Sequence, residues 1–186
     1  MKNLIFILIF LSFSFTALCQ GGVNFEQLTF DEALSKAKAE NKLVFMDCYT
    51  TWCAPCKYMA DNVFPREEAG EFFNPKFVSV KFDMENGEGK ELAQKFGVRA
   101  YPTFLIIRPD GSVQHRIVGG VNLDKFIEIA ERGLNVKTSF DYLDRLHEKG
   151  KMNKKQLISY QIALNDAYEE EKSNKVAQEL KSILKE

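Results

Sequence analysis

An apolar stretch that leads into two closely spaced cysteines limits the folds open to this chain more than any other feature. Residues 43–46, Leu-Val-Phe-Met, form a nearly continuous apolar run, as in a strand that is covered on both faces. The segment 51–57, Thr-Trp-Cys-Ala-Pro-Cys-Lys, follows at once and carries Cys53 and Cys56. The sequence therefore predicts a buried strand that delivers a Cys-x-x-Cys pair to the start of a helix.

The residues around this pair alternate between helical and strand patterns. Thr29 and Glu32 form a capping box, which predicts the start of a helix. The predicted helices cover residues 30–41, 58–64, 67–73, 90–96 and 123–132. Further strands are predicted over 77–84, 103–107 and 113–118, the last two joined as an antiparallel hairpin. This order predicts an α/β fold, a three-layer sandwich whose mixed central sheet is covered by helices on both faces.

The pattern beyond Gly133 contains no strand signal. Apolar residues at helical spacing predict helices near 140–147, 154–168 and 175–184, with Asn153 and Ser173 as N-caps. We therefore predict a domain over 20–134 and a C-terminal α-helical extension over 135–186. The apolar faces of these helices either pack on the domain and on one another or form a surface for a partner.

The N-terminus resembles a secretory signal peptide over residues 1–19. Lys2 precedes a short apolar run, and Ala17 and Cys19 are small enough for the −3 and −1 positions of a cleavage site. Two alternatives are a lipid anchor on Cys19 and an uncleaved anchor. The leader predicts export to a periplasmic or extracellular compartment, where disulfides persist.

Charge and cysteine usage restrict the function further. The chain has 25 basic and 26 acidic residues and a net charge of −1, which excludes broad attraction to nucleic acid or acidic membranes. The spacing of His115 and His147 does not suit a zinc site with the cysteines, so we expect no metal and ordinary surface or hairpin histidines. A purely structural Cys53–Cys56 disulfide is a further alternative, although so short a loop constrains the unfolded chain little.

A redox role accounts for more of the residues around the cysteines than a metal site or a structural disulfide does. A sulfur on Cys53 at a helix N-terminus has a lowered pKa and is a better nucleophile. Cys56, one turn further in and less exposed, is placed to resolve a mixed disulfide, and Pro55 fixes the geometry of the first turn. Asp47, at the end of the buried strand, is predicted to exchange a proton with Cys56; the alternative is a carboxylate that caps the next helix.

Five separated features then occur in the order found in the thioredoxin superfamily, which the segment 25–134 resembles. They are Asp47, the segment 52–57, Lys81, the segment 101–103 and Gly119. The resemblance implies a thioredoxin-like fold and a dithiol that exchanges disulfides without a bound cofactor or metal.

The resemblance also implies roles for the residues around the dithiol. Pro102 is expected to be cis, the Tyr101 backbone to pair with an extended substrate, and Gly119 to let that substrate approach. Lys81 is expected to tune the buried carboxylate, and Trp52 and Tyr49 to form an aromatic rim. Each has a plainer alternative: Lys81 as a solvated strand residue, Gly119 as a turn, and the two aromatic residues as ordinary core or surface side chains.

The differences within the superfamily favour one direction of electron flow. Ala54-Pro55 is closer to the dipeptide of reducing thioredoxins than to the His-containing pairs of oxidases and isomerases. The stretch between Cys56 and Phe77 resembles exported domains akin to the C-terminal domain of DsbD-type disulfide reductases. These features predict an exported protein-disulfide reductase that acts on disulfide-containing clients and takes electrons from a membrane thiol donor. The alternatives are an oxidase or isomerase, and a client-binding module without turnover.

One cysteine remains outside this dithiol. Cys48 lies on the predicted buried strand, where the superfamily normally has a bulky apolar residue. We expect a core thiol there; the alternative is a third redox partner.

Overall fold

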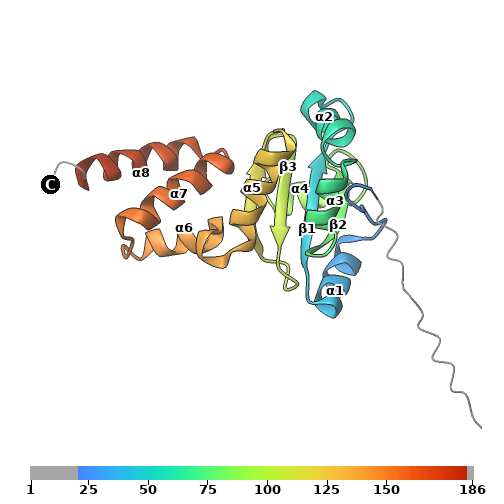
Figure 1. Ribbon diagram of the computed structural model, residues 1–186, viewed down its shortest axis with the longest axis horizontal. Helices are drawn as coiled ribbons and strands as arrows, with labels where there is room; N and C mark the ends of the chain where they lie inside the picture. The colour runs from blue at the N-terminus through green and yellow to red at the C-terminus, as the bar shows by residue number, and fades with distance from the viewer. Residues whose placement is uncertain (1–20, 184–186) are drawn as a thin grey trace, which may run out of the picture.

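The computed structural model describes residues 21–183, and a four-stranded sheet lies at its centre (Figure 1). The strands lie in the order β2-β1-β3-β4, namely Phe77–Asp83, Leu43–Tyr49, Thr103–Ile107 and Val113–Val118. β1 pairs in parallel with β2 and antiparallel with β3, and β4 pairs antiparallel with β3. The predicted mixed sheet and hairpin are confirmed.

Helices cover both faces of this sheet. They are α1 (Phe30–Glu40), α2 (Ala54–Asn62), α3 (Glu67–Phe73), α4 (Gly89–Lys95) and α5 (Leu123–Leu134). Alternation along β1 divides its side chains between two apolar clusters. Val44 and Met46 pack with α1 and α4, whereas Phe45 packs on the opposite face with α2, α3 and α5. The predicted three-layer arrangement is therefore confirmed.

The same alternation decides where Asp47 lies. Asp47 follows Phe45 by two positions, so it shares the face covered by α2, and it stands beside Lys81 in the register of β1 with β2. The loop after β1 leads directly into α2, which begins at Ala54 with Cys53 as its N-cap, so the cysteine pair lies at the start of a helix as predicted. The sheet thus places a carboxylate beneath the start of the cysteine-bearing helix.

The C-terminal helices form a separate small bundle. Their bounds are Phe140–Glu148 for α6, Lys154–Asp166 for α7 and Glu170–Ile183 for α8, after the 3-10 turn Val136–Thr138. Seven buried residues pack in its interior: Leu143, Leu157, Tyr160, Ala163, Leu164, Val176 and Leu180. Ion pairs Arg108–Asp141 (2.9 Å) and Arg132–Asp166 (2.6 Å) join the bundle to the domain. The first alternative for the apolar faces, mutual packing, is the one observed.

One expectation about the extension was wrong, and the expectation for His115 holds only in part. α8 begins at Glu170, where two acidic residues suit the positive end of a helix, so Ser173 lies inside the helix and is not its N-cap. Its hydroxyl instead donates to Asn165 Oδ1 at 2.6 Å. His115 does lie on a hairpin strand, β4, but it is completely buried and not a surface residue. Its Nδ1 accepts a hydrogen bond from the Phe140 backbone N–H (3.1 Å).

The predicted signal peptide over 1–19, including Cys19, lies outside the described residues. Within residues 21–183, no helix combines the length and apolar character needed to cross a membrane.

Candidate functional site

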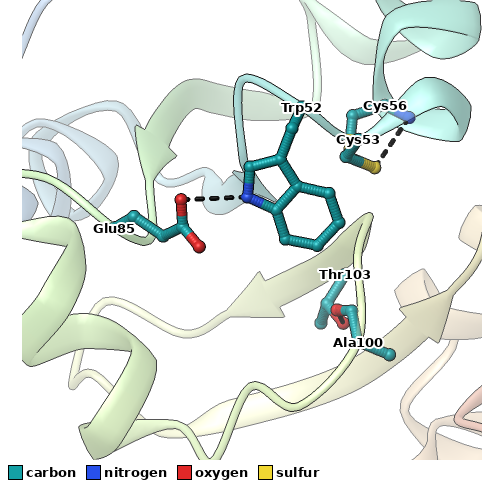
Figure 2. Close-up of a disulfide and its surroundings, with 6 residues drawn as sticks. All are labelled: Trp52, Cys53, Cys56, Glu85, Ala100 and Thr103. Atoms are coloured by element: carbon teal, nitrogen blue, oxygen red, sulfur yellow. Dashed lines mark hydrogen bonds between the residues drawn. A yellow bond between two sulfur atoms is a disulfide. The ribbon is translucent and has the colours of Figure 1, made fainter.

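Cys53 and Cys56 form a disulfide at the N-terminus of α2, with their Cα atoms 5.2 Å apart. Cys53 is the N-cap, and its sulfur accepts a hydrogen bond from the Cys56 backbone N–H at 3.1 Å (Figure 2). Pro55 occupies the first turn, which contains no acidic residue. A negative charge on the Cys53 sulfur is therefore stabilised by a backbone donor and by the helix dipole.

The expectation that Cys56 is the less exposed cysteine was wrong. Cys53 and Cys56 are 4% and 7% exposed, so both are buried in the disulfide form. The bond joins the two sulfur atoms, and both cysteines line the same cavity.

Asp47 is the buried titratable group of this site. It is 6% exposed, and its Oδ1 has no hydrogen-bond partner among the described residues. Burial raises its pKa from 3.8 to about 7, and the positive charge of Lys81 opposes this shift. Asp47 does not cap α2, since that position belongs to Cys53, so the capping alternative is wrong. A carboxyl with a pKa near neutrality is suited to giving and taking a proton.

A cavity connects this carboxyl to the disulfide. It has a volume of about 220 Å³ and is lined by Asp47, Tyr49, Thr50, Thr51, Cys53, Cys56, Lys57, Ala60 and Lys81. A second cavity, of about 180 Å³, touches Asp47 and Lys81 from the side of Gly22 and Phe64. Cavities of this size and polarity have room for water. The structure thus brings five of the predicted site residues to one cavity: Asp47, Tyr49, Cys53, Cys56 and Lys81.

Trp52 forms an exposed wall beside the disulfide. Its side chain is 68% exposed, and its ring meets that of Tyr101 edge-on with 6.0 Å between centroids. The indole N–H donates to Glu85 Oε2 at 3.0 Å (Figure 2). Glu85 was not predicted as a site residue. Its signal is positional, because Glu85 follows β2 at the same sheet edge where the parallel neighbour β1 leads to the cysteines.

The predicted cis-proline is present: the Tyr101–Pro102 peptide bond is cis. On one side of it, the Thr103 hydroxyl donates to the Ala100 carbonyl oxygen at 2.8 Å. On the other, the Gly119 N–H donates to the Pro102 carbonyl oxygen at 2.9 Å. Gly119 has φ +95°, which favours glycine, and the space where a Cβ would lie is open. Gly119 therefore lies against the cis-proline loop, and Tyr101 of that loop contacts Trp52.

The third described cysteine stands apart from this chemistry. Cys48 is a free thiol, fully buried, in the apolar cluster on the α1 face of the sheet. Burial raises its pKa far above the ordinary range, so it stays protonated. The predicted core thiol is confirmed. No cluster of three or more His, Cys, Asp or Glu residues within 21–183 has a geometry that could hold a metal ion.

A disulfide at a helix N-terminus, next to a cis-proline and close to a buried carboxyl with a raised pKa, is the arrangement expected of a thiol-disulfide oxidoreductase. Comparison with known families agrees: the thioredoxin-like domain family matches residues 30–134, more than half of the chain. The chain belongs to this family. Its three-layer fold is thioredoxin-like, as predicted, and the helices α6 to α8 lie beyond the matched segment.

Relatives of known function or structure support the same assignment. Over 90 residues the chain is 42% identical to an H-type thioredoxin of rice (Oryza sativa subsp. indica). This match covers 48% of this chain and 68% of that protein. Over 99 residues it is 32% identical to the thiol:disulfide interchange protein DsbD of Pseudomonas fluorescens, covering 52% of this chain and only 17% of DsbD. The predicted likeness to DsbD-type proteins is therefore confirmed for one segment of DsbD.

A solved structure resembles the domain closely. The solution structure of a Bacteroides thetaiotaomicron protein, provisionally described as a disulphide-isomerase, is 44% identical in sequence and has a TM-score of 0.57. The match covers 62% of this chain and 95% of that protein. The domain thus has a full-length structural counterpart.

Proposed function

We propose that this protein is an exported reductase of disulfides in protein clients. The observation that carries the proposal is the common cavity shared by the Cys53–Cys56 pair and by Asp47, whose pKa of about 7 suits proton exchange near neutrality.

The reaction begins with the reduced dithiol. The Cys53 thiolate attacks one sulfur of the client disulfide, forms a mixed disulfide and releases the other client sulfur as a thiolate, which takes up a proton. Asp47 then accepts the proton of the Cys56 thiol, directly or through water in the cavity. The Cys56 thiolate attacks the Cys53 sulfur and releases the second client thiolate. Two electrons pass to the client, and the enzyme is left with the Cys53–Cys56 disulfide.

The surroundings of Cys53 explain how a client is held. An extended client segment pairs with the Tyr101 backbone beside the cis-proline, in the manner of an added strand. Gly119 leaves space for that segment, and Trp52 covers the reacting sulfur from the side. Glu85 fixes the indole orientation by its hydrogen bond. Lys81 lowers the cost of a charged Asp47 during the proton transfer.

Three observations support the reducing direction and the compartment. The Ala54-Pro55 dipeptide resembles that of reducing thioredoxins, and one segment resembles DsbD. The leader over 1–19 favours export, after which a membrane thiol donor has to return two electrons to the oxidised dithiol. Lipidation at Cys19 keeps the same chemistry but tethers the domain to a membrane.

Disulfide isomerisation is the second candidate, favoured by the 44% identity to the Bacteroides thetaiotaomicron protein. An isomerase uses the same attack by Cys53, but the client reacts again with its own thiols, so no net electrons are transferred. The two functions differ in how strongly the dithiol reduces its partners.

The reduction potential of the dithiol tests the direction. The chain from Gln20 onward, with Cys48→Ala to remove the third thiol, is equilibrated in dithiothreitol and glutathione buffers. We expect a value near that of thioredoxin, about −270 mV. A value near −180 mV or above replaces the reductase with an isomerase or oxidase. If no reversible couple exists, only a client-binding module remains. The mass of the exported chain, beginning at Gln20 or lipidated at Cys19, tests the compartment.

A further inference from the structure

A larger cavity lies between the domain and the C-terminal extension. Its volume is about 430 Å³, and the turn between α7 and α8 forms one of its walls. The extension contributes Ala167, Tyr168 and Glu169; the domain contributes Gly97, Arg99, Ala100, Thr103, Arg116 and Val118. This cavity is separate from the one that joins Asp47 to the cysteines, since the two have no lining residue in common.

The cavity borders the surface that holds the client in the proposed reaction. Ala100 directly precedes the cis Tyr101–Pro102 pair in the chain, and Thr103 directly follows it. Val118 directly precedes Gly119, whose N–H donates to the Pro102 carbonyl. An extended segment bound along the cis-proline loop therefore passes the mouth of this cavity within a few residues of its reacting cysteine.

The charges around the cavity are unbalanced. Arg99 and Arg116 bring two guanidinium groups to it, and Glu169 brings one carboxylate. Neither arginine forms an ion pair with a residue in the described part of the chain. Arg116 uses one nitrogen to donate to the Phe96 carbonyl oxygen at 2.5 Å. Burial lowers the pKa of Arg116, so a further negative charge nearby would stabilise its charged form.

The extension holds its side of the cavity in a defined conformation. Tyr168 is 66% exposed and has φ +58°, a conformation uncommon for a bulky residue. Two backbone hydrogen bonds fix the turn: Tyr168 N–H to Asn165 oxygen (3.1 Å) and Glu169 N–H to Leu164 oxygen (2.8 Å). Tyr168 therefore lines the cavity from a turn that backbone hydrogen bonds hold in place.

We propose that this cavity is a specificity subsite, in which Arg99 and Arg116 bind a carboxylate side chain that lies close to the disulfide of a protein client. The inference rests on the proposed function and assigns a role to the extension, which supplies the outer wall. Guanidinium groups bind carboxylates well because their N–H donors match both oxygens. Glu169 competes with the client carboxylate for the same arginines.

Matched peptides test the subsite. Each is a short peptide closed by one disulfide, neutral except for one variable position that holds Asp or Asn. That position lies within about four residues of a cysteine, a reach of roughly 13 Å in an extended chain. The full mature protein is reduced beforehand, freed of reductant and mixed with each peptide in a single turnover, so its own dithiol supplies both electrons. The bimolecular rate constant is read by acid quench and mass spectrometry. The neutral bis(2-hydroxyethyl) disulfide reports exchange chemistry without a side chain for the subsite.

Point variants distinguish binding of a carboxylate in the subsite from a general effect of charge on the rate. We expect the Asp peptide to react about fivefold faster than the Asn peptide at one position, a ratio that falls at high salt. Arg99→Gln lowers this ratio towards one, and Glu169→Gln raises it, because Glu169 no longer competes. Arg145→Gln is the matched control: it removes an exposed charge of the extension that pairs with Asp141 outside the cavity, and the ratio stays unchanged.

The outcomes distinguish failure of the subsite from failure of the proposed function. If the hydroxyethyl disulfide is reduced but Asp and Asn peptides react equally at every position, the subsite is wrong and the reductase stands. An Asp preference that survives Arg99→Gln and Arg116→Gln together also overturns the subsite. If neither the peptides nor the hydroxyethyl disulfide reacts, both proposals are wrong.

Discussion

Asp47 and His115 are both buried titratable residues, but they lie in very different parts of the molecule. Both are buried, and each has one polar atom, Asp47 Oδ1 or His115 Nε2, without a hydrogen-bond partner among the described residues. Burial favours the neutral form of both, so it raises the pKa of Asp47 to about 7 and lowers that of His115 to about 3.

Access to the reacting atoms distinguishes them. Asp47 borders two cavities, one of which reaches the Cys53–Cys56 pair, and Lys81 stands next to it. His115 is fully enclosed; its ring packs against Gly133, where a Cβ would lie only 2.8 Å from the His115 ring. Its Nδ1 holds the first residue of α6. A buried titratable group thus becomes a candidate for chemistry where a cavity connects it to a reactive partner, and otherwise acts as a packing contact.

The largest effect that we expect from the difference between Asp47 and His115 is on the pH dependence of stability. Between pH 3.8 and about 7, folded Asp47 keeps a proton that the unfolded chain has lost, so its contribution to stability falls as pH rises. Asp47→Asn removes this loss. We expect the variant to gain nothing over the wild type below pH 4 and about 4 kcal/mol above pH 7, at ~1.4 kcal/mol per pKa unit.

Urea denaturation of the disulfide form from pH 4 to 8 measures this difference. The contribution of His115 has the opposite sign: its folded pKa lies below the unfolded value of 6.5, so stability is lost as pH falls from 6.5 to about 3. The two trends partly offset each other in the wild type, which is why the variant difference is the informative quantity. A difference that is constant across pH would show that Asp47 does not titrate as a buried carboxyl.

Resolution of the mixed disulfide is expected to respond next most strongly. Asp47→Asn removes the group that accepts the Cys56 proton, so we expect about a 100-fold slower resolution step at pH 7, the lower end for general acid-base catalysis. Because hydroxide replaces the lost base, the deficit shrinks as pH rises. Stopped-flow measurement with a peptide disulfide records the step. Asp61→Asn, an exposed carboxylate on the same helix α2, is the matched control and keeps the wild-type rate. An equal loss in both variants would make the effect one of general charge.

Much of the fold could be predicted from sequence because its signals are local. The capping box at Thr29 and the strands over 103–107 and 113–118 lie where predicted, since caps and apolar runs act within a few residues. The start of α8 could not be predicted, because Ser173 has the side chain of an N-cap residue. In the structure its hydroxyl instead donates a hydrogen bond to Asn165 of α7. Tertiary contacts of this kind have no local signature.

In the candidate site, too, some features could be predicted from the sequence and others depend on tertiary contacts. The positions of Cys53, Asp47 and the cis bond before Pro102 follow from a motif and a resemblance. The hydrogen bond from Trp52 to Glu85 and the burial of His115 depend on which segments the sheet brings together. The raised pKa of Asp47 likewise depends on how deeply its carboxyl is buried, which the local sequence does not show, whereas the influence of Lys81 was expected from the resemblance.

His115 gives the smallest of the expected effects and tests the other half of the comparison. His115→Ala leaves the Phe140 N–H without its acceptor, and we expect a loss of about 2 kcal/mol in unfolding free energy. His115→Asn, whose Oδ1 can take the place of Nδ1, is expected to recover about half of it. Neither variant should change the rate of disulfide exchange per folded molecule, because His115 lines neither of the two cavities that reach Asp47. Slower exchange in His115→Ala at full folding would mean that contacts of β4 with α6 reach the redox site, and the distinction between the two buried groups would then fail.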